Sequence, residues 1–357
     1  MSKLLKQSHT TTPPYALIEG LHPTSVVHRP HSPAKISFSD GSSETSACLR
    51  CPDPPCMSFA PSEVRSTSLD GFPADTSPQT CAAGAMTIDL AVAVPDIDPD
   101  RCVACGVCAS RCPAGAIFIT DGLGAVVAGG IPSPRAFAQA TDESHFSFAA
   151  TLAELIASPH EGTIAVESDE LFQRSATVMD RVASVIGEGF AQHHVRNLLI
   201  ALGQGASMRR RGNNHMRMDL LLGSPGIARG AVEVEFGQIA AIEAPRDMLD
   251  SIAVLSSRHD WKADEIVTLI VTDKLPNSRS GYWDVIADIK QVTDISIGTV
   301  TTFALHLAIW LRKPLPDPSL FYSDRASAGY RARVLQVIAG RELRISADAF
   351  PQIEIAK

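Results

Sequence analysis

The sequence predicts an α+β protein made of two unlike parts, a small cysteine-rich domain followed by a larger mixed α/β domain. All eight cysteines lie between Cys48 and Cys112. From residue 168 onward, apolar residues recur with helical and strand periods in alternation. The length of 357 residues exceeds that of one ordinary domain. We therefore expect an N-terminal extension, a cysteine domain, a linker and a second domain over residues 1–45, 46–130, 131–167 and 168–357.

The composition excludes several classes of protein. Hydrophobic residues make up 45% and charged residues 20%, as in a globular rather than a disordered chain. The net charge of -8 excludes a histone-like or tail-driven binder of nucleic acid, but not a local basic groove. No signal peptide is apparent, and the longest apolar stretch, 295–311, falls short of a membrane span. We expect a cytoplasmic protein without membrane contact, in which clustered cysteines bind metal rather than form disulfides.

The most specific motif is a run of four cysteines, Cys102-x2-Cys105-x2-Cys108-x3-Cys112, followed by proline. Three cysteines at this spacing wrap a loop around one iron–sulfur cube, and the fourth reaches another cluster. A tetrahedral zinc site prefers two separate pairs, so zinc is the weaker interpretation. Over residues 45–120 the chain resembles the bacterial two-cluster ferredoxins.

A second, altered run of cysteines precedes this motif. Cys48-x2-Cys51-x4-Cys56 resembles the variant found in ferredoxin-like oxidoreductase subunits, but 24 residues then intervene before Cys81. The segment CAAGAMTID at Cys81 parallels CPAGAIFIT at Cys112, which indicates an internal repeat. Cys81 lacks the usual following proline, and the insertion also departs from the family pattern.

The ferredoxin resemblance implies two 4Fe–4S clusters whose ligands cross over between the halves. The first cluster would take Cys48, Cys51, Cys56 and Cys112, and the second would take Cys81, Cys102, Cys105 and Cys108. The ligands alone leave three roles open for the clusters: carrying electrons, sensing redox state, or holding a small domain together.

In the second domain the apolar pattern predicts the order α-β-β-β-α-β. Helical spacing marks residues 178–186 and 195–199, and two glycines lie between them. Three short segments follow, ASMRRRGNNH, MRMDLLLG and GAVEVEFGQ, and the last two alternate with the period of a strand. A helix is expected to begin at Pro245, and the apolar run EIVTLIVTD is expected to be a buried central strand. Further elements are expected over 281–312 and 324–354.

Three carboxylates in this domain fall at positions that could bring them together. Glu233 and Glu235 share one face of their predicted strand, while the valines between and before them point to the core. Asp219 would lie beside them if its strand pairs with theirs. Such a group suits Mg²⁺ or Mn²⁺, which can activate water against a phosphodiester.

The strand order and these three residues resemble the restriction-endonuclease-like PD-(D/E)xK fold over residues 170–275. The resemblance implies a metal-dependent DNA endonuclease, in DNA processing or defence, with Asp219 and Glu233 as the acidic motif residues. Glu235 stands where most of the family has lysine, which puts activity in doubt. The alternatives are a solvated strand face on which the glutamates pair with arginines, and an inactive fold that only binds.

Basic residues favour a DNA-facing surface near these carboxylates. Seven arginines and two acids occur between Arg174 and Arg217. Arg209, Arg210 and Arg211 suit a turn that contacts phosphate groups, and the alternative is a solvated hairpin tip. Because no aromatic residues are interleaved, duplex DNA is favoured over single strands as a partner.

Other residues in this domain have structural interpretations. Glu188 is a candidate metal contact but is better explained as a surface residue, and His193 and His194 are expected on a helix surface. Tyr282 and Trp283 are expected to be packing anchors. Two functions therefore remain: a DNA endonuclease with an iron–sulfur domain, and an electron-transfer protein whose C-terminal domain docks a redox partner.

Overall fold

The structure of the protein is a computed structural model. It describes residues 27–30, 55–64, 75, 77–89, 94–98, 101–103, 105–111, 117–120, 126–127, 179–208, 216–223, 229–277, 280–310 and 314–323. The predicted linker over 131–167, the basic turn at 209–211 and the elements expected over 324–354 lie outside the described residues. No helix of the described part is long and apolar enough to cross a membrane.

The described residues of the N-terminal part form two small antiparallel sheets and two single-turn helices. One sheet has the order β1-β4-β5, and the other is a hairpin of β2 and β3. The elements are β1 (Val27–Pro30), α3 (Pro61–Val64), β2 (Met86–Asp89), β3 (Val94–Ile97), α4 (Val107–Ser110), β4 (Ile117–Thr120) and β5 (Val126–Val127).

The internal repeat seen in the sequence produces equivalent strands. β2 begins five residues after Cys81, and β4 begins five residues after Cys112. Each strand pairs antiparallel with a partner from earlier or later in the chain, β4 with β1 and β2 with β3. Because β1 lies within residues 1–45, part of the segment interpreted as an extension pairs with the cysteine-rich part.

The C-terminal part confirms the predicted α-β-β-β-α-β order and extends it. A helix over residues 179–186 comes first, and a break at two glycines separates it from the next helix. The following elements are α8 (Phe190–Ala201), β6 (Ala206–Met208), β7 (Leu220–Leu222), β8 (Gly230–Glu235), α9 (Gln238–His259), β9 (Val267–Thr272), α10 (Tyr282–Thr293), β10 (Gly298–Thr301) and α11 (Thr302–Trp310). Two 3-10 helices, η2 (Ala263–Glu265) and η3 (Pro318–Phe321), complete the described elements.

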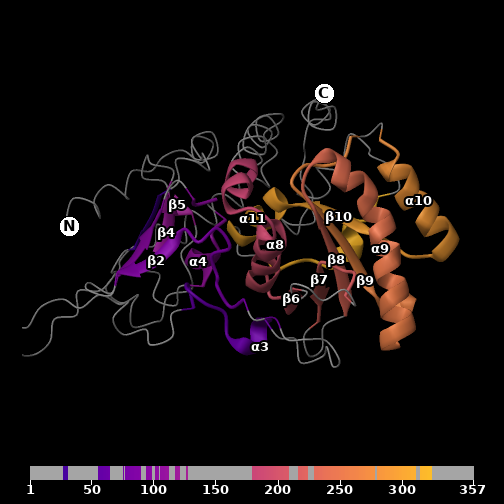
Figure 1. Ribbon diagram of the computed structural model, residues 1–357, viewed down its shortest axis with the longest axis horizontal. Helices are drawn as coiled ribbons and strands as arrows, with labels where there is room; N and C mark the ends of the chain where they lie inside the picture. The colour runs from indigo at the N-terminus through magenta and orange to yellow at the C-terminus, as the bar shows by residue number, and fades with distance from the viewer. Residues whose placement is uncertain are drawn as a thin grey trace, which may run out of the picture.

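These strands form one mixed sheet with the order β10-β9-β8-β7-β6. β8, β9 and β10 run parallel, whereas β7 is antiparallel to both of its neighbours. The apolar run predicted as a central strand is β9, which lies between β8 and β10. Helices α8 and α11 lie on the side of the sheet that faces the cysteine-rich part, and α9 and α10 lie on the other side (Figure 1).

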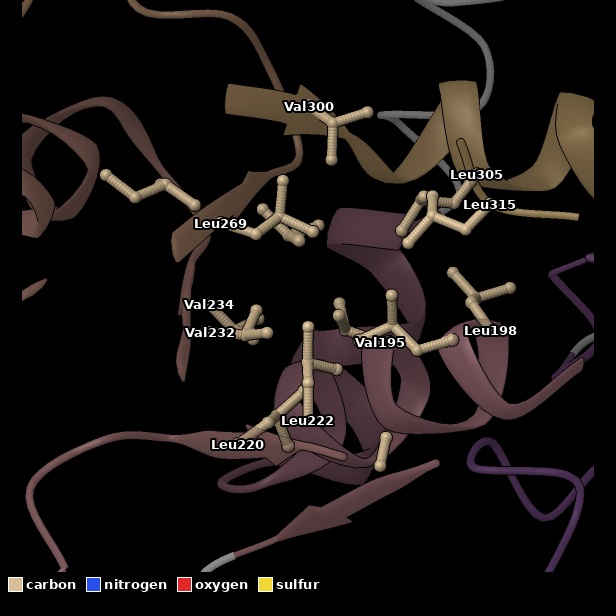
Figure 2. Packing of buried hydrophobic residues seen from close by; sticks show 14 of the residues in the cluster. Val195, Leu198, Leu220, Leu222, Val232, Val234, Leu269, Val300, Leu305 and Leu315 are labelled. Atoms are coloured by element: carbon tan, nitrogen blue, oxygen red, sulfur yellow. The ribbon is translucent and has the colours of Figure 1, made fainter. Parts of the chain in front are cut away.

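The main core lies between the sheet and helices α8 and α11 (Figure 2). Fully burying one valine or leucine side chain stabilises the fold by roughly 1.5–3 kcal/mol, so this layer contributes strongly. The labelled core residues are Val195, Leu198, Leu220, Leu222, Val232, Val234, Leu269, Val300, Leu305 and Leu315.

The aromatic pair at the start of α10 is buried, as predicted for packing anchors. The Tyr282 hydroxyl and Thr299 Oγ1 are 2.7 Å apart, and Trp283 Nε1 donates to the Pro276 carbonyl at 3.2 Å. Both rings are at most 3% exposed, so they fix α10 against β10 and the loop after β9.

One helix start was predicted wrongly. Helix α9 begins at Gln238, and Pro245 lies inside it. Proline lacks the N–H that would bond to the carbonyl of Ala241, which normally disfavours it in a helix interior. Ala241, Ala244 and Met248 are buried, so packing of the whole helix against the sheet offsets this loss.

Candidate functional site

Five of the eight predicted ligand cysteines lie in the described part, and none of the five forms a disulfide. Three are buried and two are half-buried: Cys56, Cys102 and Cys108, then Cys81 and Cys105. The other three, Cys48, Cys51 and Cys112, lie outside the described residues.

The structure brings Cys81 to the later cysteines, as the predicted ligand crossover requires. Burial raises the pKa of the Cys108 thiol well above its usual value, and Cys105, Cys102, Cys81 and Cys56 raise it further. Enclosure of the Cys105 thiol raises its pKa to about 12, and Cys81 adds to the increase. Cys81 and Cys105 also pack against the small core that contains Cys102. Among the described residues no three cysteines are arranged around one ion, so the assignment of these ligands stays a prediction.

In the loop that carries Cys81, two backbone N–H groups donate to that cysteine, one to its sulfur and one to its carbonyl. The backbone N–H of Ala85 donates to Cys81 Sγ at 3.2 Å, and the N–H of Gly84 donates to the Cys81 carbonyl at 3.1 Å. Gly84 has a φ of 57°, in the left-handed region that favours glycine. A Cβ added there would lie 3.3 Å from the movable end of the Arg101 side chain, so the positive φ rather than lack of space favours glycine.

Residues that immediately precede three of the predicted ligands meet at one backbone carbonyl. The Pro55 carbonyl accepts from Arg111 Nε at 2.9 Å and from Thr80 Oγ1 at 3.1 Å. These residues come directly before Cys56, Cys112 and Cys81 respectively. The chain segments leading into Cys56, Cys112 and Cys81 are thus tied together, so this contact joins residues from both predicted ligand sets.

Arg111 also binds Glu63 through both terminal nitrogens. Its Nη1 and Nη2 donate to the two carboxylate oxygens at 2.8 and 2.9 Å. Burial would raise the pKa of Glu63, but the bonds from Arg111 and the Ala60 N–H outweigh it and lower that pKa. All the side-chain nitrogens of Arg111 are therefore engaged.

The insertion between Cys56 and Cys81 docks onto α8 through Asp75. Asp75 Oδ2 accepts from Arg196 Nη1 at 2.7 Å and from the Met208 N–H at 3.1 Å, and Asp75 Oδ1 accepts from the Ser77 N–H at 2.8 Å. The Arg196 and Asp75 side chains are only 0% and 3% exposed. The unusual insertion is therefore the segment that joins the cysteine-rich part to the C-terminal part.

Two more residues of α8 hold the end of the insertion. Asn197 Nδ2 donates to the carbonyls of Thr80 at 2.7 Å and Gln79 at 3.0 Å. His193 Nε2 lies 3.2 Å from the same Gln79 carbonyl. The residues just before Cys81 are thus positioned by α8 rather than by the cysteine-rich part alone.

The prediction that His194 lies on a helix surface is wrong. His194 is 2% exposed, its ring stacks on Phe190, and its Nε2 lies 2.8 Å from Nε2 of His306 on α11. Burial lowers the pKa of His306 to about 3, and burial followed by the charge of His306 lowers that of His194. The sequence pattern missed this because α8 is covered on two sides, by the insertion and by α11.

The three carboxylates of the C-terminal part are brought close to one another. β7 and β8 pair with Leu220 opposite Val232, which confirms the predicted strand pairing. Asp219 Oδ2 accepts from the Val234 N–H at 3.0 Å, and Ser251 Oγ on α9 donates to Glu233 Oε1 at 2.6 Å. The glutamate face of β8 is therefore covered by α9.

Burial and mutual repulsion perturb both glutamates. Burial raises the pKa of Glu233 to about 8, and Asp219 adds the next largest contribution. Burial raises the pKa of Glu235 to about 7, again with Asp219 next and then Asp247. Asp247 on α9 is a member of this group that the sequence analysis did not assign, although its position four residues before Ser251 places both on one helix face.

This geometry corrects one alternative and leaves the metal prediction untested. Glu233 is 3% exposed, so the interpretation of the two glutamates as a solvated strand face is wrong for Glu233, whereas Glu235 is half-buried. Glu188 is exposed at the helix break and is not among the groups that shift the glutamate pKa values. Among the described residues no three His, Cys, Asp or Glu side chains are arranged around one ion, so binding of Mg²⁺ or Mn²⁺ by Asp219, Glu233 and Glu235 stays a prediction.

Comparisons with known proteins identify the cysteine motif. Residues 95–118 match the 4Fe–4S binding domain. The chain is also similar to an uncharacterized ferredoxin of Methanocaldococcus jannaschii, with 37% identity over 84 residues, covering 21% of this chain and 53% of the relative. The chain thus spans about half the length of the curated relative it matches. No solved structure matches the chain significantly.

These matches show ferredoxin-type iron–sulfur binding and give no support to the nuclease resemblance. The matched segment contains Cys102, Cys105, Cys108 and Cys112, the four cysteines of the more specific motif. The matched family domain is far shorter than the chain, and the mixed α/β sheet of the C-terminal part lies outside it.

Proposed function

We propose that this protein is an electron carrier of the ferredoxin type, with two 4Fe–4S clusters and a C-terminal α/β domain that docks a redox partner. The observation that carries the proposal is the position of Cys81. It packs, with Cys105, against the small core that contains Cys102, although 20 residues separate Cys81 from Cys102 in the sequence. A ligand crossover between two half-motifs requires this approach.

The residues present fit such clusters. When bound, a 4Fe–4S cluster accepts and releases one electron at a potential set by its surroundings. The buried thiols of Cys56, Cys102 and Cys108 exclude water, and the N–H of Ala85 directed at Cys81 Sγ stabilises negative charge on sulfur. Cys81 and Cys105 are half-buried, so the second ligand set reaches toward the surface, as electron exchange with a partner requires.

The direct test is cluster content and reduction. Anaerobically purified full-length protein is expected to bind roughly eight irons per chain, and its visible absorption should bleach with dithionite. The Cys81→Ser variant should bind one of the two clusters more weakly or lose it, and it should keep the other cluster. Binding of one mononuclear iron in place of clusters, or of no iron after reconstitution, would refute the proposal.

A second candidate function rests on a separate observation, the coupled carboxylates under α9. We infer that they are suited to divalent-metal-dependent cleavage of duplex DNA, with Asp219, Glu233 and Glu235 as the acidic group. The strand order of the C-terminal part and the pairing of β7 with β8 support this. Burial is the main cause of the raised pKa values of Glu233 and Glu235, and a cation would offset both the burial of the charges and the added repulsion from Asp219.

Plasmid cleavage tests the second candidate. Iron-loaded protein is incubated with supercoiled plasmid and Mg²⁺ or Mn²⁺, beside the Glu233→Gln variant and the exposed control variant Glu243→Gln. Cleavage lost only in Glu233→Gln would support a nuclease. Equal cleavage by all three proteins would show a contaminant, and no cleavage with either metal would remove this candidate.

A further inference from the structure

Helix α8 carries three polar side chains on the face that it turns toward the cysteine-rich part. His193, Arg196 and Asn197 are three and four positions apart, so they lie on one face of the helix. Arg196 binds Asp75, and the other two residues contact the end of the insertion between Cys56 and Cys81. This face of α8 is therefore occupied by the chain segment that leads into a predicted ligand.

Asn197 holds both of the residues that precede Cys81. Its Nδ2 donates to the Thr80 carbonyl at 2.7 Å and to the Gln79 carbonyl at 3.0 Å. Because both partners are acceptors, only the NH₂ side of the amide can face them, and the orientation of the group is fixed. The Thr80 N–H donates in turn to the Met57 carbonyl at 3.0 Å. The residues before Cys81 are thus held between the cysteine-rich part and α8.

Asparagine is a poor choice for the interior of α8 except for these two bonds. Asn197 is 1% exposed in the middle of the helix, where asparagine is less favourable than leucine. Its Oδ1 is buried and has no hydrogen-bond partner among the described residues. Burying such an oxygen is unfavourable. The side chain is therefore better explained by what its Nδ2 holds than by the stability of the helix.

The second predicted ligand set also touches α8 at another place. Cys102 shares a small core with Phe190, the first residue of α8. Cys81 and Cys105 pack against the same core. Helix α8 therefore approaches this ligand set twice, through the apolar core at its first residue and through the bonds of Asn197 one and two residues before Cys81.

We propose that Asn197 is a positioning residue for the second cluster, which it serves by holding Cys81 in the orientation that binds iron. The inference rests on the proposed function, since it needs a cluster held by Cys81, Cys102, Cys105 and Cys108. Groups that orient the ligands of a metal typically contribute about 10–100-fold to its affinity. The C-terminal part is then a component of the cluster-binding unit in addition to a docking domain.

The first experiment follows the loss of iron from full-length, iron-loaded protein to a ferrous chelator under anaerobic conditions. Asn197→Leu is similar in size to the wild type, but it removes the two bonds and the unpartnered oxygen. We expect one cluster to be released about 10–100-fold faster and the other to be released at the wild-type rate. The EPR signal that is lost early should be the signal that is missing in Cys81→Ser.

Thr299→Val is the matched control for a general loss of stability. It breaks the buried 2.7 Å hydrogen bond with Tyr282, which lies between β10 and α10 on the other side of the sheet from α8 (Figure 1). Both clusters should be released from this control at the wild-type rate. Unchanged release in Asn197→Leu, equal acceleration of both clusters, or the same acceleration in Thr299→Val would overturn the inference.

A second measurement uses wild-type protein alone and does not depend on a variant that folds. If α8 helps Cys81 to bind a cluster, the cluster must stabilise α8 to the same extent, because such coupling is reciprocal. Hydrogen exchange in α8 and α10 is compared by mass spectrometry between loaded and iron-stripped protein. Exchange should become faster in α8 after removal of iron and stay unchanged in α10. Unchanged exchange in α8 would overturn the inference.

The outcomes separate the inference from the function on which it rests. Wild-type protein that binds no cluster would overturn both. Two clusters in the wild type, released at the same rates in Asn197→Leu, would overturn the role of Asn197 and leave the electron-carrier proposal standing. Early loss of the same EPR signal in Asn197→Leu and Cys81→Ser, together with faster exchange in iron-stripped α8, would establish the positioning role.

Discussion

Removing the Asp75 carboxylate should allow the cysteine-rich part to unfold separately from the C-terminal part. Asp75→Ala leaves the Arg196 guanidinium buried and uncompensated, and it also removes the acceptor of the Met208 and Ser77 N–H groups. Breaking a buried ion pair by removing one partner typically costs about 3–5 kcal/mol. We expect the free energy of unfolding to fall by that amount in Asp75→Ala, because both side chains are almost fully buried.

The assay can follow the two parts separately. All three tryptophans lie in the C-terminal part, at positions 261, 283 and 310, so their fluorescence reports its unfolding. The visible absorption of the clusters reports the cysteine-rich part. In anaerobic urea titrations the two signals should change together in the wild type, and the absorption should be lost at lower urea in Asp75→Ala.

Two further variants isolate the cause. Asp75→Leu combined with Arg196→Met replaces the pair by apolar side chains, and it should recover most of the lost stability because no charge is left buried. Asp250→Ala breaks an exposed pair with Arg217 and should change stability by less than about 1 kcal/mol. A loss below about 1 kcal/mol in Asp75→Ala, with both signals still coincident, would refute the reasoning.

Three other predictions follow from the same structure. Burial raises the pKa of Glu233 from 4.5 to about 8, so the folded state keeps a proton that the unfolded chain releases. Glu233 alone should lower the free energy of unfolding by about 1.4 kcal/mol per pH unit between these values. Glu233→Gln, measured by urea titration in EDTA, should remove this part of the fall and leave the part due to Glu235. The low pKa of buried His306, about 3, has the opposite sign: its contribution to stability should be complete above the ordinary value of 6.5 and decline as pH falls toward 3. Because Glu233 acts in the opposite direction above pH 4.5, this contribution is measured as the difference between the wild-type and His306→Gln profiles, and a difference that stays constant over this range would contradict the buried neutral pair. Gly230→Ala would place a Cβ 2.6 Å from the Val267 carbonyl oxygen of the neighbouring strand and should destabilise by about 1–3 kcal/mol, whereas Gly281→Ala, with nothing within 4 Å, should change the thermal unfolding midpoint little.

Local patterns in the sequence predicted much of the C-terminal fold. The strand period placed Glu233 and Glu235 on one face, and the continuous apolar run identified β9 as a central strand, because burial on both faces requires apolar residues at every position. The internal repeat after Cys81 and Cys112 corresponds in the structure to strands β2 and β4.

Contacts between distant segments could not be predicted in this way. Asp75 and Arg196 are 121 positions apart, and no periodic pattern connects them. The burial of His194 depends on α11, and the start of α9 at Gln238 depends on packing that overrides Pro245. The participation of Asp247 required knowing which face of α9 covers β8.

The central sheet lies between the cysteines and the carboxylates. The cysteine-rich part lies on the α8 side of the sheet, whereas Glu233 contacts Ser251 of α9 on the opposite side (Figure 1). A redox partner and a ligand of the carboxylate group would therefore approach from opposite directions. If both proposed ligands bind, neither would have to leave before the other arrives.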